Sequence, residues 1–302
     1  GELQIADNLV SVASTGVIGE LLPLEPFSGG IPKLVKNLSA DQAVAVAEAM
    51  MTTDAFSKTA TAMESGEQNY RILGLAKGAG MIHPNMATML GFVLTDAQVN
   101  PVLLKPVLER AVKKSFNSIT VDGDTSTNDM VLLLANGAAN SAVIEPDTRE
   151  AEIFSQHLER VLLDLAKMIV RDGEGATKLV QIRVIGAENE DSARIAARSV
   201  ATSSLVKTAF FGEDANWGRI IAAVGYSGVN IDPNRIDISF NQVPVAINGL
   251  AVGSEQEAAA TRVLQLDEFV VTVDLHQGKA ESSYYTSDLN YEYIKINADY
   301  RT

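Results

Sequence analysis

The step between Ala87 and Thr88 has the residue types that a self-cleaving precursor requires. A threonine that follows a small residue, in an apolar run after a glycine-rich turn, can direct its hydroxyl at the carbonyl carbon before it. The peptide would shift to an ester, and hydrolysis would free a chain that begins at Thr88. Its new α-amine, with a reference pKa of about 7.7–8.0, could serve as the base for its own hydroxyl. Most Ala-Thr pairs are ordinary backbone, so this interpretation depends on the residues around it.

Other catalytic chemistries find little support in the sequence. The three histidines, His83, His157 and His276, lie far apart without metal-ligand spacing, and His157 is expected to face solvent on a helix. Neither a Ser-His-Asp triad nor a zinc site is therefore indicated, which favours the α-amine as base. The glycine-rich stretch that begins at Lys77 lacks both Gly-Lys-Ser/Thr and Gly-x-Gly-x-x-Gly. It predicts a tight turn rather than a phosphate-binding loop.

A second polar block contains Asp122, Asp124 and Asp129. Its carboxylates suggest a metal loop, but the spacing and the terminal glutamate of a calcium-binding hand are absent. We therefore interpret these residues as structural or turn-capping. Trp217, the single tryptophan, is expected in the core or in a wall of the site.

Composition narrows the class of protein. The chain has 302 residues, 46% of them hydrophobic, so it can bury a large core. Its formal charge of −14 argues against a nucleic-acid or anionic-membrane partner. The absence of cysteine excludes disulfides and a thiol nucleophile, and it is compatible with a reducing cytoplasm. Neither a membrane span nor a secretory signal is visible, so a cytoplasmic location is expected.

Helical and strand patterns alternate along the chain, which predicts a mixed α/β fold without internal repeats. A capping box at residues 39–42 is expected to start a helix that runs to Met51. Further helices are predicted at residues 101–116, 147–170 and 191–202. The last third is expected to be mostly strand, with strands at residues 177–185, 235–240, 242–247 and 269–275 and turns at 248–249 and 277–278.

The glycine-rich turn and the Ala-Thr step resemble the signature of a known family. Lys-Gly-Ala-Gly-Met-Ile at residues 77–82, followed by Pro-Asn-Met-Ala-Thr-Met-Leu at 84–90, is similar to the ornithine acetyltransferases, also called glutamate N-acetyltransferases, of arginine biosynthesis. Six further blocks match in the family's order, at residues 14–19, 51–54, 121–129, 172–176, 212–219 and 296–302. The resemblance therefore covers nearly the whole chain.

The resemblance implies a fold and a reaction. The fold would be of the N-terminal-nucleophile type, in α/β (α+β mixed) layers, with an N-terminal segment 1–87 and a C-terminal segment 88–302 intertwined as one unit. The reaction would move an acetyl group from N2-acetylornithine to glutamate through an acyl ester on Thr88. The family's oxyanion pair falls on Thr15 and Gly16, whose hydroxyl and open backbone N–H suit that role.

The resemblance also implies the residues that bind substrate. They are Thr52, Lys77, Thr88, Glu174, Asn297 and Thr302. Lys77 could pair with a substrate α-carboxylate and Glu174 with the side-chain ammonium of ornithine. Asn297 and Thr302 would form a C-terminal flap, an unusual role because chain ends commonly fray.

Several points stay open at this level. No cofactor is expected, but some members of the family accept acetyl-CoA as a second donor. A homo-oligomer of cleaved pairs is expected. Family members carry roughly a hundred further residues before the 14–19 block, and this chain is expected to lack that part, which should contribute strands and helices to the first domain. The rival interpretations are an amidohydrolase or aminopeptidase with the same threonine, or an inactive assembly protein.

Overall fold

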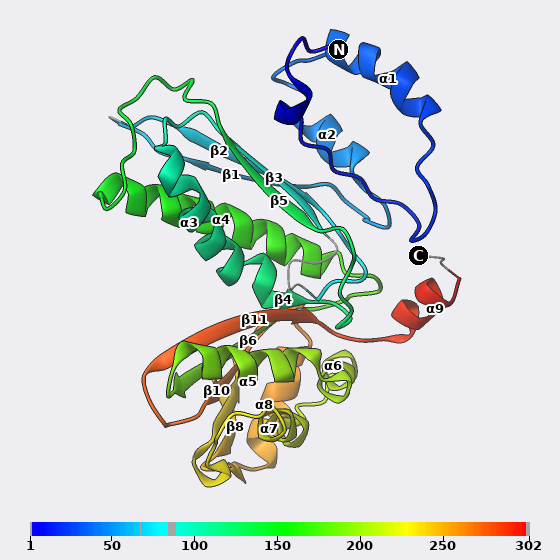
Figure 1. Cartoon of the computed structure of the whole chain (residues 1–302). Coiled ribbons are helices and arrows are strands. Elements are labelled where there is room, and N and C mark those ends of the chain that lie inside the picture. The colour runs from blue at the N-terminus through cyan, green and yellow to red at the C-terminus, as the bar shows by residue number, and fades with distance from the viewer. Residues whose placement is uncertain (1, 67, 84–88, 300–302) are drawn as a thin grey trace.

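The computed structural model describes residues 2–66, 68–83 and 89–299. Two β-sheets, each with helices packed against it, form two halves that meet near β4 and β11 (Figure 1). Each half has its own apolar core, one beneath α3 and α4 and the other around α5 and the strands of the second sheet. The mixed α/β class predicted from the sequence is confirmed.

The first sheet has the strand order β1-β2-β3-β5. Its strands are β1 (Lys58–Met63), β2 (Arg71–Lys77), β3 (Leu90–Thr95) and β5 (Met130–Ala135). β2 is antiparallel to β1 and β3, whereas β3 is parallel to β5. At one end of the sheet, Leu90 pairs with both Lys77 and Met130. β2, which precedes Ala87, is thus hydrogen-bonded to β3, which follows Thr88.

Two helices cover one face of this sheet. α3 (Pro101–Lys114) begins where the Asn100 side chain accepts from Val102 N–H, and α4 (Arg149–Arg171) begins where Thr148 accepts from Ala151 N–H. Gly74 in β2 makes room for α4, because a Cβ there would lie 2.6 Å from Val161. Side chains alternate between the faces of a strand, so Lys77 points to the opposite face from Gly74.

The second sheet has the order β4-β11-β6-β10-β7-β8-β9. Its strands are β4 (Ile119–Thr120), β6 (Leu179–Ala187), β7 (Asp237–Phe240), β8 (Val243–Ile247), β9 (Leu250–Ala251), β10 (Glu268–Asp274) and β11 (Ala280–Ser287). Its helices are α5 (Glu190–Thr202), α6 (Ser204–Phe211), α7 (Trp217–Gly225) and α8 (Ser254–Leu264). Short 3-10 turns occupy Asp7–Leu9, Phe116–Ser118 and Pro233–Arg235.

In Figure 1, α1 (Glu25–Lys36) lies at the top right of the molecule and α9 (Tyr291–Asp299) lies at its right edge. The N-terminal part holds α1 and α2 (Ala43–Ala49) beside the first sheet, and α9 follows β11. The α9 helix is fixed at its start by Asn290, whose side chain donates to Gly175 O at 2.5 Å and accepts from Glu292 N–H at 3.0 Å. The C-terminal helix is therefore anchored beside the end of α4.

Several predicted elements differ from the structure. The capping box at residues 39–42 is wrong, because α2 begins after Gln42 with no side-chain cap and Ser39 Oγ accepts from Asp41 N–H instead. The last third is not mostly strand, since α6, α7 and α8 were not predicted, and neither was α1. The helices predicted at residues 101–116, 147–170 and 191–202 are present within a few residues of the expected bounds. None of the helices in the described ranges is long and apolar enough to cross a membrane.

Candidate active site

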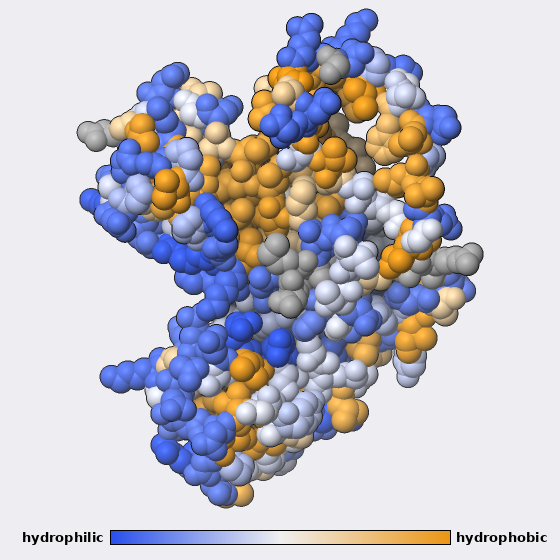
Figure 2. All heavy atoms as spheres, in the orientation of Figure 1, coloured by the Kyte–Doolittle hydropathy of each residue, from blue (hydrophilic) through white to orange (hydrophobic). Residues whose placement is uncertain are grey.

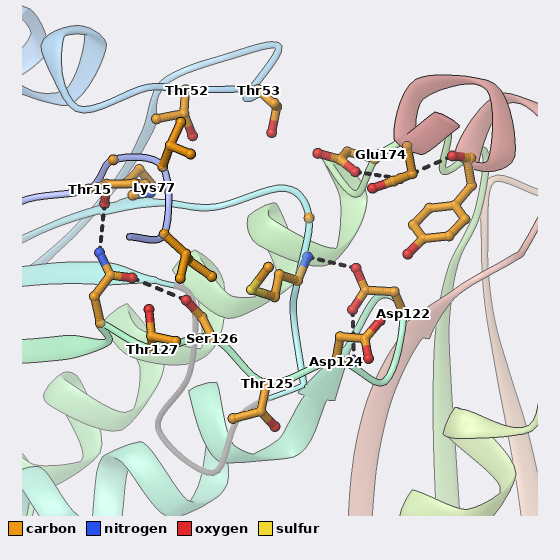
Figure 3. A pocket seen from close by; sticks show the side chains of 18 residues that line it. Thr15, Thr52, Thr53, Lys77, Asp122, Asp124, Thr125, Ser126, Thr127 and Glu174 are labelled. Carbon is orange, nitrogen blue, oxygen red and sulfur yellow. Dashed lines mark hydrogen bonds between the residues drawn. The ribbon is translucent and has the colours of Figure 1, made fainter. Parts of the chain in front are cut away.

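A cavity of about 530 Å³ opens over the end of β2, on the face of the first sheet that α4 does not cover. It is walled by the N-terminal segment, the loop after β4, the end of α4 and α9. The described residues predicted from the sequence all line it, namely Thr15, Gly16, Thr52, Lys77, Glu174 and Asn297. Ala87, Thr88 and Thr302 lie outside the described residues. Figure 3 shows Thr15, Thr52 and Lys77 on one side and Glu174, Asp122 and Asp124 on the other.

Thr15 is held by the side chain of Asn128. Asn128 Nδ2 donates to Ser14 O at 2.7 Å and to Thr15 Oγ1 at 3.1 Å, while its Oδ1 accepts from Ser126 Oγ at 3.1 Å (Figure 3). Because the Thr15 oxygen already accepts this bond, its own proton is free to be donated into the cavity. A hydroxyl held in this way can act as a side-chain donor to an oxyanion.

Lys77 is the cation of the cavity and is only 3% exposed. Burial lowers its pKa, while the nearby carboxylates of Asp54 and Asp129 oppose that shift. An amino group buried in this way gains from an anionic partner, because desolvation disfavours its charge. A substrate carboxylate in the cavity would supply that partner.

A buried ionic network fixes the strand ends behind Lys77. Lys58 Nζ donates to Asp54 Oδ1 at 2.6 Å and to Asp172 Oδ2 at 2.5 Å. Asp54 also accepts from the backbone N–H groups of Gly78 at 2.7 Å and Thr52 at 3.0 Å. Burial raises the pKa of Asp54, but these hydrogen bonds and Lys58 outweigh burial and lower it overall. The charged Asp54 therefore aligns two segments that line the cavity.

The turn after Lys77 is held by Asp122. Its carboxylate accepts from Met81 N–H at 2.7 Å, Ile82 N–H at 2.9 Å and Asp124 N–H at 3.1 Å. Burial raises the pKa of Asp122 despite these bonds. The predicted structural role of Asp122 is confirmed, and so is that of Asp129, which accepts from Met89 N–H at 2.6 Å.

Glu174 faces the cavity from the loop after α4. Its backbone N–H donates to Ala79 O at 3.0 Å, and its Oε2 accepts from Asn297 Nδ2 at 2.9 Å (Figure 3). A Cβ on Gly80 would collide with the Glu174 carboxylate, so glycine at this position leaves room for the carboxylate where it lies. Glu174 and Lys77 give the cavity a carboxylate and an ammonium from different walls. That pair suits a substrate that itself carries both charges.

Sequence reasoning missed part of the lining. The loop after β4 was interpreted only as structure, yet six of its residues line the cavity: Asp122, Asp124, Thr125, Ser126, Thr127 and Asn128. Tyr293 on α9 lines it as well. The density of hydroxyl and amide side chains in this short block was the signal that could have identified it.

The histidines lie apart from this cavity. His83 Nδ1 is 3.3 Å from Thr120 Oγ1, and burial, together with the charge of Arg198, lowers its pKa. The expectation that His157 faces solvent is wrong: its side chain is 21% exposed, and Nδ1 lies 3.0 Å from the hydroxyl of Tyr70. Among the described residues, no group of three or more His, Asp or Glu side chains is placed to hold a metal ion.

Comparison with known proteins gives consistent matches along the chain. A family model described as the ArgJ family matches residues 1–302. The chain is 59% identical over 300 residues to the arginine biosynthesis bifunctional protein ArgJ of Syntrophotalea carbinolica, which covers 99% of this chain and 76% of that protein. It is 54% identical over 298 residues to the protein of the same name from Geobacter sulfurreducens, covering 98% of this chain and 76% of that one.

A solved structure is similar as well. The crystal structure of arginine biosynthesis bifunctional protein ArgJ from Bacillus halodurans matches with a TM-score of 0.68 at 42% sequence identity. The match covers 70% of this chain and 100% of that one. At 42% identity, the two chains are similar in sequence as well as in fold.

Proposed function

This chain belongs to the ArgJ family and is a bifunctional acetyltransferase of arginine biosynthesis, and we propose that one threonine-based site performs both of its reactions. The family predicted from the order of the motifs is confirmed. The donors would be N2-acetylornithine and acetyl-CoA, and the acceptor would be glutamate. The site would be the cavity beside Lys77, completed by Thr88.

The first half-reaction loads the acetyl group. Thr88 Oγ attacks the acetyl carbonyl carbon of N2-acetylornithine, and the new C–O bond forms as the C–N bond to ornithine breaks. The hydroxyl proton passes by way of the Thr88 α-amine to the leaving nitrogen. The hydroxyl of Thr15 and the backbone N–H of Gly16 stabilise the oxyanion of the tetrahedral intermediate.

The second half-reaction uses the same cavity. Glutamate replaces ornithine, and its α-amine attacks the acetyl ester, forming a C–N bond as the C–O bond breaks. The proton lost by the amine returns to Thr88 Oγ. Both substrates are α-amino acids, so Lys77 serves the α-carboxylate in each half-reaction. A ping-pong mechanism follows, because ornithine leaves before glutamate enters.

The convergence of distant residues carries this proposal. Thr15, Thr52, Lys77, Glu174 and Asn297 come from segments far apart in sequence, yet they line one cavity. The cavity combines a buried ammonium with carboxylates and hydroxyl groups, as a charged amino-acid substrate requires. Among its described lining residues there is no histidine, so the base that we propose comes from outside the described lining. The α-amine of a cleaved Thr88 would supply it.

The register of β2 and β3 supports the proposed cleavage at Ala87-Thr88. Leu90 pairs with Lys77, so the proposed new terminus begins two residues before a strand position opposite the cavity lysine. After cleavage, the segments would stay associated through the hydrogen bonds between β2 and β3.

Intact mass and a donor assay test the proposal. The purified protein should give two fragments that meet between Ala87 and Thr88, and Thr88→Ala should stay at 32.2 kDa and be inactive. Acetyl transfer from N2-acetylornithine to glutamate should be measured beside the release of free acetate. Predominant acetate release would instead indicate an amidohydrolase. An active enzyme with an uncut Ala87-Thr88 bond would exclude the proposed base.

Assembly and location complete the proposal. We place the protein in the cytoplasm as a homo-oligomer of cleaved pairs. Light scattering after size-exclusion chromatography measures the assembly, and a mass equal to one cleaved pair would contradict it.

A further inference from the structure

A second cavity, of about 460 Å³, lies between the end of α3 and the helix α5. Its walls include His83, Lys113, Arg194 and Arg198, and we name it the basic cavity. Thr125 lines both the basic cavity and the candidate active site, so the two cavities adjoin. Figure 2 shows hydrophilic side chains where the surface is hollowed between the two halves of the molecule.

The charge of the basic cavity opposes that of the chain. The net charge is −14, yet no carboxylate is among the described residues that line this cavity. A neighbouring cavity shares Lys113 and Arg194 but includes Glu190 and Glu281 in its walls. A pocket of cations in an acidic protein concentrates anions locally and is a candidate binding site for them.

The cations of the basic cavity are incompletely neutralised. Lys113 pairs with Glu190 at 3.1 Å, both of them exposed, and the partly buried Arg194 pairs with the exposed Asp191 at 3.7 Å. Asp124 acts electrostatically on His83. Arg198, by contrast, forms no ion pair with any residue that the structure describes. It is exposed on the surface of α5, where a ligand can reach it.

Arg194 supplies an independent indication of a missing acceptor. Its Nε atom is buried and has no hydrogen-bond partner among residues 2–66, 68–83 and 89–299. Buried donors in native proteins are nearly always paired, so an unpaired guanidinium nitrogen in a pocket wall calls for an acceptor. The forked guanidinium geometry suits phosphate oxygens in particular.

We propose that the basic cavity binds the phosphorylated nucleotide end of acetyl-CoA, with Arg194 and Arg198 on its phosphates. This rests on the proposed function, in which acetyl-CoA is the second acyl donor. A volume of about 460 Å³ is in the range of a small-molecule site and exceeds what a lone phosphate needs. The flexible pantetheine arm then passes Thr125 into the candidate active site.

The acyl step in this arrangement is balanced. The C–S bond of the thioester breaks as the bond between Thr88 Oγ and the acetyl carbon forms, and the hydroxyl proton leaves on the CoA sulfur. No oxidant, reductant or further reactant is needed. The same acetyl ester is then consumed by glutamate. The two donors therefore share Thr88 but differ in their use of the basic cavity.

The test compares two donors that differ only in the nucleotide. Arg198→Glu should raise KM for acetyl-CoA by about tenfold or more, because it removes a charge-assisted phosphate contact. KM for S-acetyl-pantetheine, which lacks the nucleotide, and KM for N2-acetylornithine should stay the same. Arg262→Glu on α8 makes the same charge change at an exposed position away from both cavities and should leave all three values unchanged.

Direct binding separates this proposal from the proposed function. By titration calorimetry, CoA should bind the wild type and Arg262→Glu, and should bind Arg198→Glu more weakly, whereas pantetheine should bind all three alike. This outcome would support the site even if no acetyl transfer from acetyl-CoA occurred. Equal CoA binding by wild type and Arg198→Glu would overturn the site, even in an enzyme that uses acetyl-CoA. Inorganic diphosphate that binds as tightly as CoA would overturn the nucleotide assignment.

Discussion

The carboxylate of Asp129 accepts a hydrogen bond from the backbone N–H of Met89 at 2.6 Å, directly after the proposed cleavage site. Its other oxygen, Oδ2, is buried and has no donor among the residues that the structure describes. Burial raises the pKa of Asp129 to about 6, although the Met89 bond and the charge of Lys77 act in the opposite direction. A carboxyl group that titrates near neutral pH thus fixes the residue that follows Thr88.

We predict that Asp129→Asn slows maturation. Asparagine keeps an acceptor for Met89 N–H but removes the charge that could assist proton transfer at Thr88. The uncleaved fraction, measured by intact mass over time after synthesis, should rise, with a rate loss of about 10²-fold or more. Asp164→Asn, on the exposed side of α4, should mature normally. Normal maturation of Asp129→Asn would show that Asp129 only holds Met89.

The same carboxyl group should affect stability in a pH-dependent way. The pKa of Asp129 is raised in the folded state to about 6, so the fold binds this proton more tightly than the unfolded chain does. Its stabilising contribution is present below the unfolded pKa of about 3.9 and is lost as pH rises through about 6.

Thermal unfolding in a Thr88→Ala background keeps the protein as one chain for this measurement. Relative to that parent, the free energy of unfolding of Asp129→Asn should rise by about 1 kcal/mol between about pH 4 and about pH 7. This value is reduced because the Asp129 carboxyl is only partly buried. A Tm difference that stays constant over this range would contradict the assigned shift.

A third prediction concerns the network behind Lys77. Lys58→Met should lower the free energy of unfolding by about 3–5 kcal/mol, because it leaves Asp54 and Asp172 buried without their cation. Arg171→Ala breaks an ion pair with Glu268 whose partners are 56% and 52% exposed, and should cost about 1 kcal/mol or less. Chemical denaturation measures both. A loss in Lys58→Met no larger than in Arg171→Ala would show that the network does not support the fold.

Sequence reasoning predicted the fold best where apolar residues recur at a clear helical or strand spacing. α3, α4 and α5 alternate apolar and polar residues at helical spacing and carry side-chain caps, so their positions were predictable. α1 has no side-chain cap and contains Pro32 and two adjacent glycines, which disfavour a helix interior, so it was not predicted. β3 and β5 are nearly continuous apolar runs, and hydrophobic periodicity alone cannot decide whether such a run is a helix or a strand.

The candidate site depended on a different kind of information. The resemblance supplied the residues around the cavity, and spacing alone would have left Thr15 as part of a turn. The contact between Lys58 and Asp172 spans 114 residues of chain, so no local pattern could have revealed it. The same holds for Asn128, which reaches back 113 residues to Thr15. Such contacts arise only when the sheets and the N-terminal segment come together.

The role of Thr15 gives a fourth prediction. Thr15→Val keeps the shape but removes the hydroxyl that Asn128 orients, so kcat should fall by about 10²–10³-fold with both donors. Thr15→Ser restores the hydroxyl and should recover most of the rate. Steady-state assays with N2-acetylornithine and acetyl-CoA provide the comparison. Equal loss in Thr15→Val and Thr15→Ser would indicate a packing role rather than an oxyanion donor.

Glu174 should act in opposite directions on the two amino-acid substrates. Its carboxylate lies in the cavity, where it can pair with the side-chain ammonium of ornithine but repels the side-chain carboxylate of glutamate. Glu174→Gln should therefore raise KM for N2-acetylornithine by about tenfold and leave KM for glutamate equal or lower. Asn297 Nδ2 can still donate to the glutamine oxygen, so the fold around the site should be kept.

Gly80→Ala probes the same contact from the other side. The added Cβ would displace the Glu174 carboxylate, so this variant should reproduce the selective rise in KM for N2-acetylornithine. Gly218→Ala in α7, where an added Cβ meets nothing closer than 3.5 Å, is the matched control. If Glu174→Gln raised KM equally for N2-acetylornithine and glutamate, the Glu174 carboxylate would maintain the shape of the cavity without discriminating between the two substrate side chains. The selectivity between the two half-reactions would then come from other residues that line the cavity.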